Sequence, residues 1–462
     1  MTADQYVAWL ADASRSQREK LAQLQEHVAT IRALFDDDHA RVLREVKKRL
    51  NSPKLAADVA TLVAALADRT ANPRPPAPAP EPAPAAPPAS APPAAIDETG
   101  ARLEAEIAAD PEAQSGYLVY GDWLASRGDP RGELVTIGHA LAKNPHHKAM
   151  LDAHRAHLAA HAARLLGPLA DCQDLVTEQD WHMGFLRACR VAYTMDRFND
   201  GPEVAIEDVI GWLVDDPAPA RFLQKLTVGI VRHDGNSYEG VARVLARRSR
   251  PALRRLFFGD FTYEETELNW SSIGDVGALW PMLPELRVLC LRSGTMQLGP
   301  IDLPRLEALE IVTGGLDPDS ARHIARATWP ELAIMSLMFG PGHRGAASDV
   351  ALVEPLLAGT RLPKLRYLAI KNCDFTDELA TLLPHAAVLP QLEALDLSQG
   401  TLSDAGVRAL AAHRDKLAHL YLVVDENFLT TPGIDLLRTL VARLESGEQR
   451  NPNRGRYAAM YE

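Results

Sequence analysis

Histidines concentrate in one short stretch, where they are the residues best suited to metal chemistry. On a helix, positions 154, 157 and 161 would share one face, and imidazoles at that spacing could ligate a metal ion. No carboxylate or thiol stands in register with them to complete a ligand shell. We therefore predict a solvated helix face that holds no metal. Six of the fifteen histidines of the chain lie in this stretch: His139, His146, His147, His154, His157 and His161.

No other residue pattern predicts catalysis. The chain has none of the motifs G-x-x-x-x-G-K-[ST], H-E-x-x-H or G-x-S-x-G. The Gly-rich run from Gly340 to Gly345 lacks the Lys-Ser/Thr pair of a phosphate loop, so we expect an ordinary loop there. Cys290 falls at an outward strand position, but no histidine stands near it in the sequence. The sequence thus predicts a protein that is not an enzyme and needs no cofactor.

Charge and composition limit the classes of partner. The chain has 462 residues, with 49 basic and 61 acidic side chains and a net charge of −12, which argues against a nucleic-acid binder. Six arginines lie within residues 243–255 without interleaved aromatics, so we expect a solvated helix or an acidic protein partner there. No run approaches the ~18 apolar residues of a membrane span, and no secretory signal is visible at the start. We expect a cytoplasmic protein that does not bind membranes.

A Pro/Ala-rich segment divides the chain. Residues 71–95 contain 11 prolines and 10 alanines in 25 positions, so this stretch cannot build a core and is expected to be a semi-rigid spacer. We assign the linker to 71–96. It separates a helical module at 1–70 from a helical segment at 97–175, a repeat region at 176–446 and a tail at 447–462.

The N-terminal module carries a heptad-like seam. Its apolar residues follow a 3,4,3,4 spacing, which is typical of helices that pack in a coiled coil or a three-helix bundle. A unit of about 70 residues is marginally stable alone, so we expect self-association or a partner helix here. A three-helix bundle without a partner is the alternative. The predicted assembly residues are Leu21, Leu24, Val28, Ile31 and Phe35.

The segment at 97–175 contains the most specific local motif. Residues 122–124 read Asp-Trp-Leu, and residues 127–134 read Arg-Gly-Asp-Pro-Arg-Gly-Glu-Leu. This stretch resembles the bacterial repeat-companion domain, a short helical segment that precedes repeat arrays. We expect Leu118, Trp123 and Leu134 in its core and a turn between two helices at Gly128-Asp129-Pro130.

From about residue 180 the pattern Leu-x-x-Leu-x-Leu recurs, with Ile, Val, Phe or Met at some positions. Eight clear copies span Leu223 to Leu417 at intervals of roughly 28 residues, close to the ~20–29 residues of a leucine-rich repeat. Residues 403–410 resemble the helical half of ribonuclease-inhibitor-type repeats. This resemblance implies an α/β solenoid: a curved leucine-rich repeat with a concave parallel sheet and convex helices, preceded by an all-α N-terminal module.

The outward strand positions of the repeats predict the binding surface. They mix apolar side chains with single charges, a combination that suits a protein-binding face. We therefore expect a non-enzymatic recognition scaffold or adaptor that binds a protein partner on the repeats and assembles through residues 1–70. The alternative is an inhibitor or immunity-type protein that caps an enzyme with its concave face. The predicted contact residues are Val312, Ile334, Met338, Tyr367, Lys371, Asp396, His419 and Tyr421.

Overall fold

The computed structural model describes residues 97–193, 204–215, 219–232, 235–451 and 455–458. The chain divides into two units, Met1–Ser90 and Ala91–Glu462, and all the described residues belong to the second. The predicted assembly module at 1–70 and the linker at 71–96 lie outside the described residues, as do Leu21, Leu24, Val28, Ile31 and Phe35.

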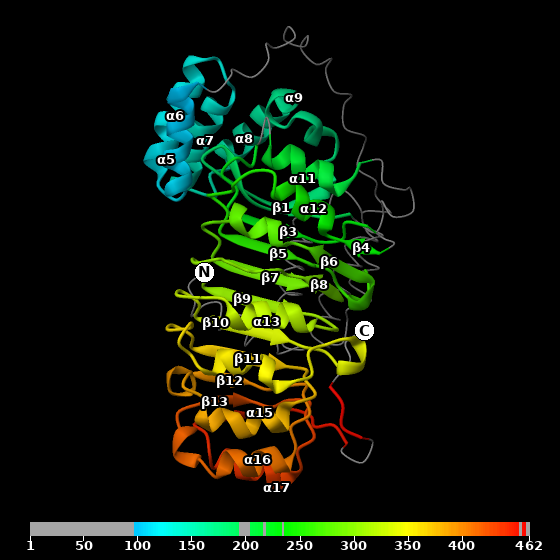
Figure 1. Ribbon diagram of the computed structural model, residues 1–462. Coiled ribbons are helices and arrows are strands. Elements are labelled where there is room, and N and C mark those ends of the chain that lie inside the picture. Colours follow the sequence, from blue (N-terminus) through cyan, green and yellow to red (C-terminus); the bar gives the residue numbers. More distant parts are fainter. Residues whose placement is uncertain (1–96, 194–203, 216–218, 233–234, 452–454, 459–462) are drawn as a thin grey trace, which may run out of the picture. The chain divides into compact units, whose positions relative to one another are not determined.

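One large, mostly parallel sheet runs through the described part of the chain (Figure 1). Its strands follow one another in sequence order, and only the first pair is antiparallel. The sheet is open, because its first and last strands are not paired with each other. The strands are β1 (Val176–His182), β2 (Phe185–Val191), β3 (Lys225–Val228), β5 (Arg255–Phe258), β7 (Val288–Arg292), β9 (Ala308–Val312), β10 (Ile334–Met338), β11 (Tyr367–Lys371), β12 (Ala394–Asp396), β13 (Tyr421–Val423) and β14 (Arg443–Glu445).

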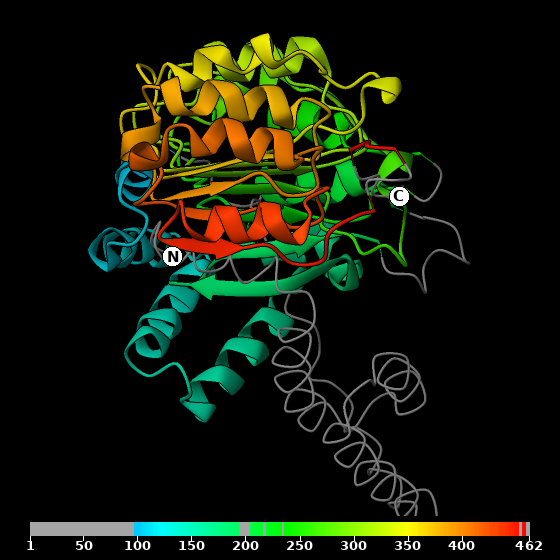
Figure 2. The same cartoon turned by 90° about the horizontal axis from the view of Figure 1, so that it is seen from below.

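Helices cover one face of this sheet, and Figures 1 and 2 show them stacked in the same order as the strands. The α-helices between strands are α11 (Ile206–Val214), α12 (Glu239–Leu245), α13 (Pro318–Arg326), α14 (Glu354–Leu357), α15 (Thr376–Leu382), α16 (Asp404–Ala411) and α17 (Thr431–Arg438). Short 3-10 turns are η1 (Gly167–Asp171), η2 (Gln173–Leu175), η3 (Leu268–Trp270), η4 (Gly277–Met282), η5 (Gly342–Arg344), η6 (Val350–Leu352), η7 (Leu383–His385), η8 (Leu389–Gln391) and η9 (Arg414–Lys416).

Alternation along each strand builds the core. In β11, Leu368 and Ile370 belong to the main hydrophobic cluster, whereas Tyr367 and Lys371 do not. Leu368 pairs in register with Met335 on one side and Leu395 on the other, so inward side chains form continuous rows across the sheet. No single strand could bury these residues by itself, so the units must stack.

Carboxylates tie the successive helix starts together. Asp377 at the start of α15 accepts hydrogen bonds from Ser403 N and Oγ, at 2.8 and 2.7 Å. One repeat later, Asp404 accepts hydrogen bonds from Thr430 N and Oγ1, at 3.0 and 2.6 Å. Ser403 in turn caps α16 by accepting from Ala405 N. Each unit therefore fixes the N-terminal turn of the next one, where free N–H groups need partners.

Four antiparallel or crossing helices precede the sheet: α5 (Glu98–Ala109), α6 (Gln114–Ser126), α7 (Arg131–Lys143) and α8 (Lys148–Ala160), followed by the single turn α9 (Ala162–Leu165). The predicted turn between α6 and α7 is confirmed, with Gly128 at φ +66°. Asp129 and Arg131 form a buried ion pair in it, at 2.8 Å. A Cβ at Gly132 would lie 2.8 Å from Ala125 N and Gly121 O, so glycine there permits the close approach of the two helices.

Several expectations need correction. Leu118 is not core: it is exposed, and Tyr117, Tyr120 and Leu124 occupy the buried side of α6 instead. The sheet begins with a β1–β2 hairpin. The repeat pattern does not predict this hairpin, because β1 carries no Leu-x-x-Leu-x-Leu motif. A second sheet was also missed, because its strands are too short to show a periodicity. It consists of β4 (Asn236–Ser237), β6 (Ser271–Asp275) and β8 (Thr295–Gln297).

The histidine-rich helix is only partly solvated. His154 on α8 is buried and its ring packs edge-on against Trp181 of β1, with centroids 5.3 Å apart. The rings of His157 and His161 lie 4.6 Å apart, and His157 Nε2 is 2.9 Å from the carbonyl oxygen of Pro130. Among the described residues, no group of three or more His, Cys, Asp or Glu side chains is placed to hold a metal ion. The prediction of a fully solvated face is wrong, because α8 packs on α7 and the ring of His154 contacts Trp181 of the first hairpin.

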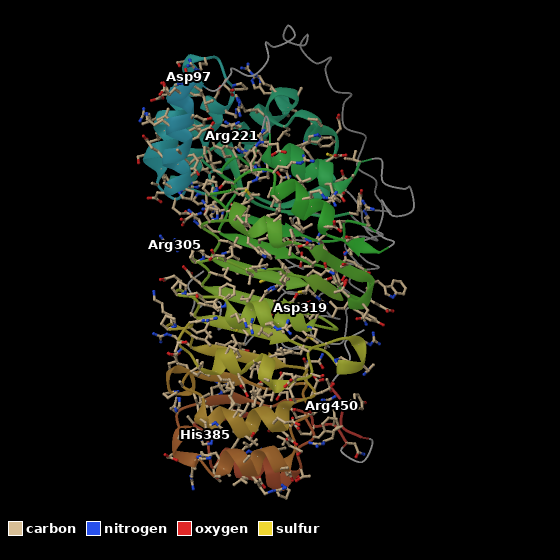
Figure 3. All side chains as sticks on the ribbon, viewed as in Figure 1. Asp97, Arg221, Arg305, Asp319, His385 and Arg450 are labelled. Atoms are coloured by element: carbon tan, nitrogen blue, oxygen red, sulfur yellow. The ribbon has the colours of Figure 1, made fainter. Side chains whose placement is uncertain are left out.

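The C-terminal tail folds back over the last units of the sheet. Arg450, labelled in Figure 3, donates to the carbonyl oxygens of Glu426 at 2.6 Å and Gln399 at 3.1 Å, so it bridges two successive units. Further along the chain, Ala458 N donates to Asp374 Oδ1 at 3.0 Å. In the described part of the chain, no helix combines the length and the apolar character that crossing a membrane would require.

Candidate functional site

The sheet face opposite the helices collects the predicted contact residues in rows. Strand register aligns Ile334 with Tyr367, Ala394 and Tyr421, and aligns Met338 with Lys371. Asp396 lies in the row between these two, in register with Val423. We call this side of the sheet the outward face. The alternation predicted from sequence therefore holds from β10 to β13.

The centre of the outward face is closed. Ile334 is 0% exposed and Met338 5%, although neither belongs to the main hydrophobic cluster. The expectation that these two side chains form an accessible apolar surface is wrong. Ile334 lies in register between Ala308 and Tyr367, and neighbouring strands of a parallel sheet lie only about 4.8 Å apart.

Two other predicted contacts also differ from expectation. Val312 is half-buried and packs against the main hydrophobic cluster, so it is not the exposed contact residue that was expected. His419 is exposed, yet it precedes β13 and is not a strand residue; its Nε2 lies 3.3 Å from the carbonyl oxygen of Leu389. Cys290, expected to be accessible, is buried on β7.

A polar network joins tyrosines and carboxylates on the outward face between β11 and β14. Tyr367 Oη donates to Asp396 Oδ2 at 3.2 Å, and Lys371 Nζ lies 4.0 Å from the same oxygen. Tyr421 Oη donates to Glu445 in the next row. Burial, with the nearby charge of Asp396, raises the pKa of Tyr367 well above its usual value, so its hydroxyl remains a donor at neutral pH.

Asp425 adds a carboxylate that the sequence reading missed. It follows β13, and its Oδ1 is buried without a hydrogen-bond partner. Burial, then the charges of Glu445, Asp396 and Glu426, raises the pKa of Asp425 to about 6. The signal in the sequence was the acidic pair Asp425-Glu426 directly after the last clear copy of the repeat, but nothing there indicated that Glu445 would return beside it.

The outward face differs in charge between its two ends. At the N-terminal end it carries Lys225 on β3 and Arg255 on β5, which occupy adjacent positions in the strand register. Arg292 on β7 donates to the carbonyl oxygen of Phe261 at 3.0 Å and lies over the Phe261 ring. The C-terminal end carries the acidic group around Asp396 and Asp425.

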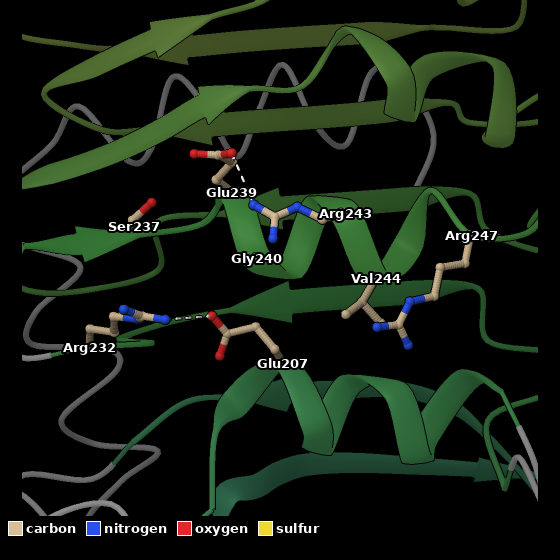
Figure 4. Close-up of a pocket in the computed structure, with 8 residues that line it drawn as sticks. All are labelled: Glu207, Arg232, Ser237, Glu239, Gly240, Arg243, Val244 and Arg247. Atoms are coloured by element: carbon tan, nitrogen blue, oxygen red, sulfur yellow. Dashed lines mark hydrogen bonds and ion pairs between the residues drawn. The ribbon is translucent and has the colours of Figure 1, made fainter.

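A separate groove lies on the helical side, between α11 and α12 (Figure 4). Its cavity volume is about 350 Å³; α11 contributes Glu207, and α12 contributes Glu239 and Arg243. Arg243 pairs with Glu239 at 3.0 Å and Arg232 pairs with Glu207 at 3.3 Å. Two residues of the arginine-rich stretch, Arg243 and Arg247, line this groove, and Arg247 lies 3.6 Å from Asp215. Both side chains remain more than half exposed, as expected of a solvated helix.

Comparison with known proteins gives a fold likeness only. No protein-family model matches the chain, and no curated protein resembles it. A crystal structure of a protein from Bacteroides fragilis superposes with a TM-score of 0.51 at 23% sequence identity, covering 68% of this chain and 86% of that one. The likeness fits a repeat protein with a large, mostly parallel sheet, and at this identity it carries no information about activity.

Proposed function

We propose that this chain is a protein-recognition scaffold built on a leucine-rich-repeat solenoid of the ribonuclease-inhibitor type. The in-register rows of Leu, Met and Ile across β7 to β13 support the repeat assignment, because each copy of the sequence pattern supplies one strand. The N-terminal module at 1–70 would assemble the scaffold, as its apolar seam suggests. We propose no catalysis and no cofactor.

The tyrosine–carboxylate network on β11 to β14 is the observation that carries this proposal. Tyrosine is enriched at protein interfaces because its ring supplies apolar contact while its hydroxyl fixes direction. Tyr367, Lys371 and Tyr421 are half-buried, so each presents part of its surface. The exposed Arg443 on β14 lies over the Tyr421 ring at 4.3 Å and extends the same surface. Ile334 and Met338, being closed off, are not part of the proposed contact.

Capture from an extract of the source cells tests the proposal, using the full chain as bait. We compare wild type with Tyr421→Ala and Lys371→Glu on the outward face, and with Arg408→Glu on the exposed side of α16 as the matched control. Loss of an interface anchor costs ~2 kcal/mol, or about 30-fold in affinity. A protein retained by wild type and the control but lost by both face variants, at unchanged melting temperature, supports the proposal. Equal retention by all four baits contradicts it.

The inhibitor alternative makes a different prediction about residues 1–70. An inhibitor that caps an enzyme with its outward face needs only the repeats, whereas an adaptor needs the module to assemble its complex. Deleting residues 1–70 should abolish the activity of an adaptor and leave that of an inhibitor intact. The captured partner, once identified, is assayed with both forms of the chain.

A further inference from the structure

A second cavity lies where the first helix of the described chain meets the repeat region. It has a volume of about 380 Å³, within the usual range for small-molecule sites. One wall is α5, through Ala101, Glu104, Ala105 and Ala108. The opposite wall comes from residues 220–223 and from the loop 248–253, which joins α12 to β5. We call this the junction cavity.

The charges of the junction cavity do not cancel. Glu104 is paired with Arg221, which is labelled in Figure 3, and Asp215 is paired with Arg250 at 2.9 Å. Arg248, exposed at the cavity, has no hydrogen-bond or ion-pair partner among the described residues. One positive charge therefore remains once the two ion pairs are subtracted from the lining.

A buried donor is also left over. Arg250 uses Nη1 for the carbonyl oxygen of Val214 at 2.8 Å and Nη2 for Asp215, but its Nε is buried without an acceptor. Buried N–H groups in native proteins almost always have a partner, whether protein, water or ligand. Because less than 1 Å² of this Nε is exposed, a ligand could reach it only if the Arg250 side chain moved. Arg248, exposed at the cavity, is therefore the group in the lining that favours a negatively charged ligand.

Apart from Ser249, the rest of the lining is apolar. Phe222, Leu223 and Leu253 contribute to it and are themselves buried, so they form a wall rather than a flexible surface. On the side of α5, alanines at 101, 105 and 108 recur at helical spacing and leave the space open that larger residues would fill. A ligand that fills this cavity therefore needs an apolar body as well as a charged end.

We propose that the junction cavity binds a small organic anion with one negative charge and an apolar body. The groove of Figure 4 does not share these features, because Arg232 and Arg243 are paired with carboxylates that line it. Arg247 is paired with Asp215, which lies outside that groove. The bound anion would touch both α5 and the loop before β5. It would therefore stabilise the attachment of the companion helices to the repeats, since a ligand that binds only the folded state raises its stability.

Calorimetric titration of the full chain with decanoate, below its micellar concentration, tests the proposal. Decylammonium and acetate serve as probes that lack the negative charge and the apolar body respectively, and 1-anilinonaphthalene-8-sulfonate serves as an anion with an aromatic body. We expect saturable one-site binding of decanoate or the naphthalene sulfonate with a rise in melting temperature. Decylammonium and acetate are expected to bind at least tenfold more weakly.

Two variants locate the binding. Arg248→Glu reverses the free charge, and Ala105→Trp fills the open side of the cavity; both positions are exposed, so the fold is expected to persist. Arg243→Glu on α12 and Ala109→Trp on α5 are the matched controls. The proposal predicts at least tenfold weaker binding for the first pair and unchanged binding for the controls. Binding of neither anion by wild type, equal binding of decylammonium, or full binding by both cavity variants would overturn it.

Discussion

The turn between α6 and α7 offers a sharp test of the energetics of the helical segment. The side chains of Asp129 and Arg131 are only 2% and 9% exposed. Asp129 Oδ1 accepts from the Arg131 N and Nε, both at 3.0 Å, and Oδ2 accepts from Nη2 at 2.8 Å. Burial raises the pKa of Asp129, but the hydrogen bonds and charge of Arg131 outweigh it and hold that pKa below its usual range.

Asp129→Asn keeps the shape of the side chain and removes its charge. The guanidinium of Arg131 then stays buried beside a neutral amide, and breaking a buried pair in this way costs ~3–5 kcal/mol. At 1.4 kcal/mol per factor of ten, the unfolding equilibrium of this segment should shift by at least 100-fold. Arg131→Met in the same chain removes the buried guanidinium charge, so the double variant should be more stable than Asp129→Asn alone.

Urea unfolding followed by circular dichroism measures this loss, and hydrogen exchange of residues 114–143 localises it. The matched control is Asp152→Asn, which breaks the exposed 2.6 Å pair with Arg155, where both side chains are more than half exposed. Exposed pairs contribute ~0–1 kcal/mol, so the control should be nearly neutral. If Asp129→Asn costs no more than Asp152→Asn, the buried pair does not stabilise the turn and our reasoning is wrong.

Three further predictions concern the repeat region. Leu368→Ala should cost ~2–5 kcal/mol of unfolding free energy and Tyr367→Ala clearly less, as measured by thermal unfolding; equal losses would mean that the strand register is wrong. The Asp425 pKa of about 6 lies above its value of 3.8 in an unfolded chain, so its charge opposes folding as pH rises through 6. Asp425→Asn should therefore raise the melting temperature at pH 7.5 and leave it unchanged at pH 4. Arg450→Ala should cost ~1–3 kcal/mol and speed proteolysis of the tail, because it removes hydrogen bonds from part-buried carbonyl groups.

The repeat pattern predicted the large, mostly parallel sheet because alternation along a strand is a local property. Leu365, Leu368 and Ile370 stand at fixed spacings, and a strand must place Leu368 and Ile370 on the same side. The alternation pattern could not predict which side chains of the outward face are accessible to solvent. This accessibility depends on which residues the neighbouring strands carry in register, and Ile334 is closed off beside Tyr367 from a strand 33 residues later.

The helical segment shows the same division. Gly128-Asp129-Pro130 was identified as a turn from residue types alone, and the structure confirms it. The ion pair to Arg131 and the helix contact at Gly132 arise only when α6 and α7 are packed together. Likewise, the burial of His154 depends on Trp181, which lies on a strand of the first hairpin that carries no repeat motif. Contacts between elements of different type are the part that periodicity cannot supply.

Two histidines are expected to make the junction between helices α5 to α8 and the sheet sensitive to pH. His154 packs against Trp181, and His182 packs edge-on against Tyr117 at 5.4 Å. Burial lowers the pKa of both; the charge of His157 adds to this at His154, and that of Arg187 at His182, where Glu112 and Asp180 oppose it. The Nε2 atoms of both rings are buried without partners, so an added proton would carry an unsolvated charge.

The sign of the effect follows from the direction of these shifts. In the unfolded chain a histidine titrates near 6.5, and in the folded chain these two titrate lower, so the unfolded state binds more protons as pH falls. Their contribution to stability is therefore complete above about pH 6.5 and is lost progressively below it. These measurements use the Asp425→Asn chain as the parent, because it lacks the carboxyl whose titration has the opposite effect. The melting temperature of this parent chain should fall as the pH is lowered from 7.5 to 5. The fall should be smaller in His154→Gln and His182→Gln, whereas the exposed His146→Gln should behave like the parent. A decline of the same size in all four chains would show that protonation of the junction does not control it.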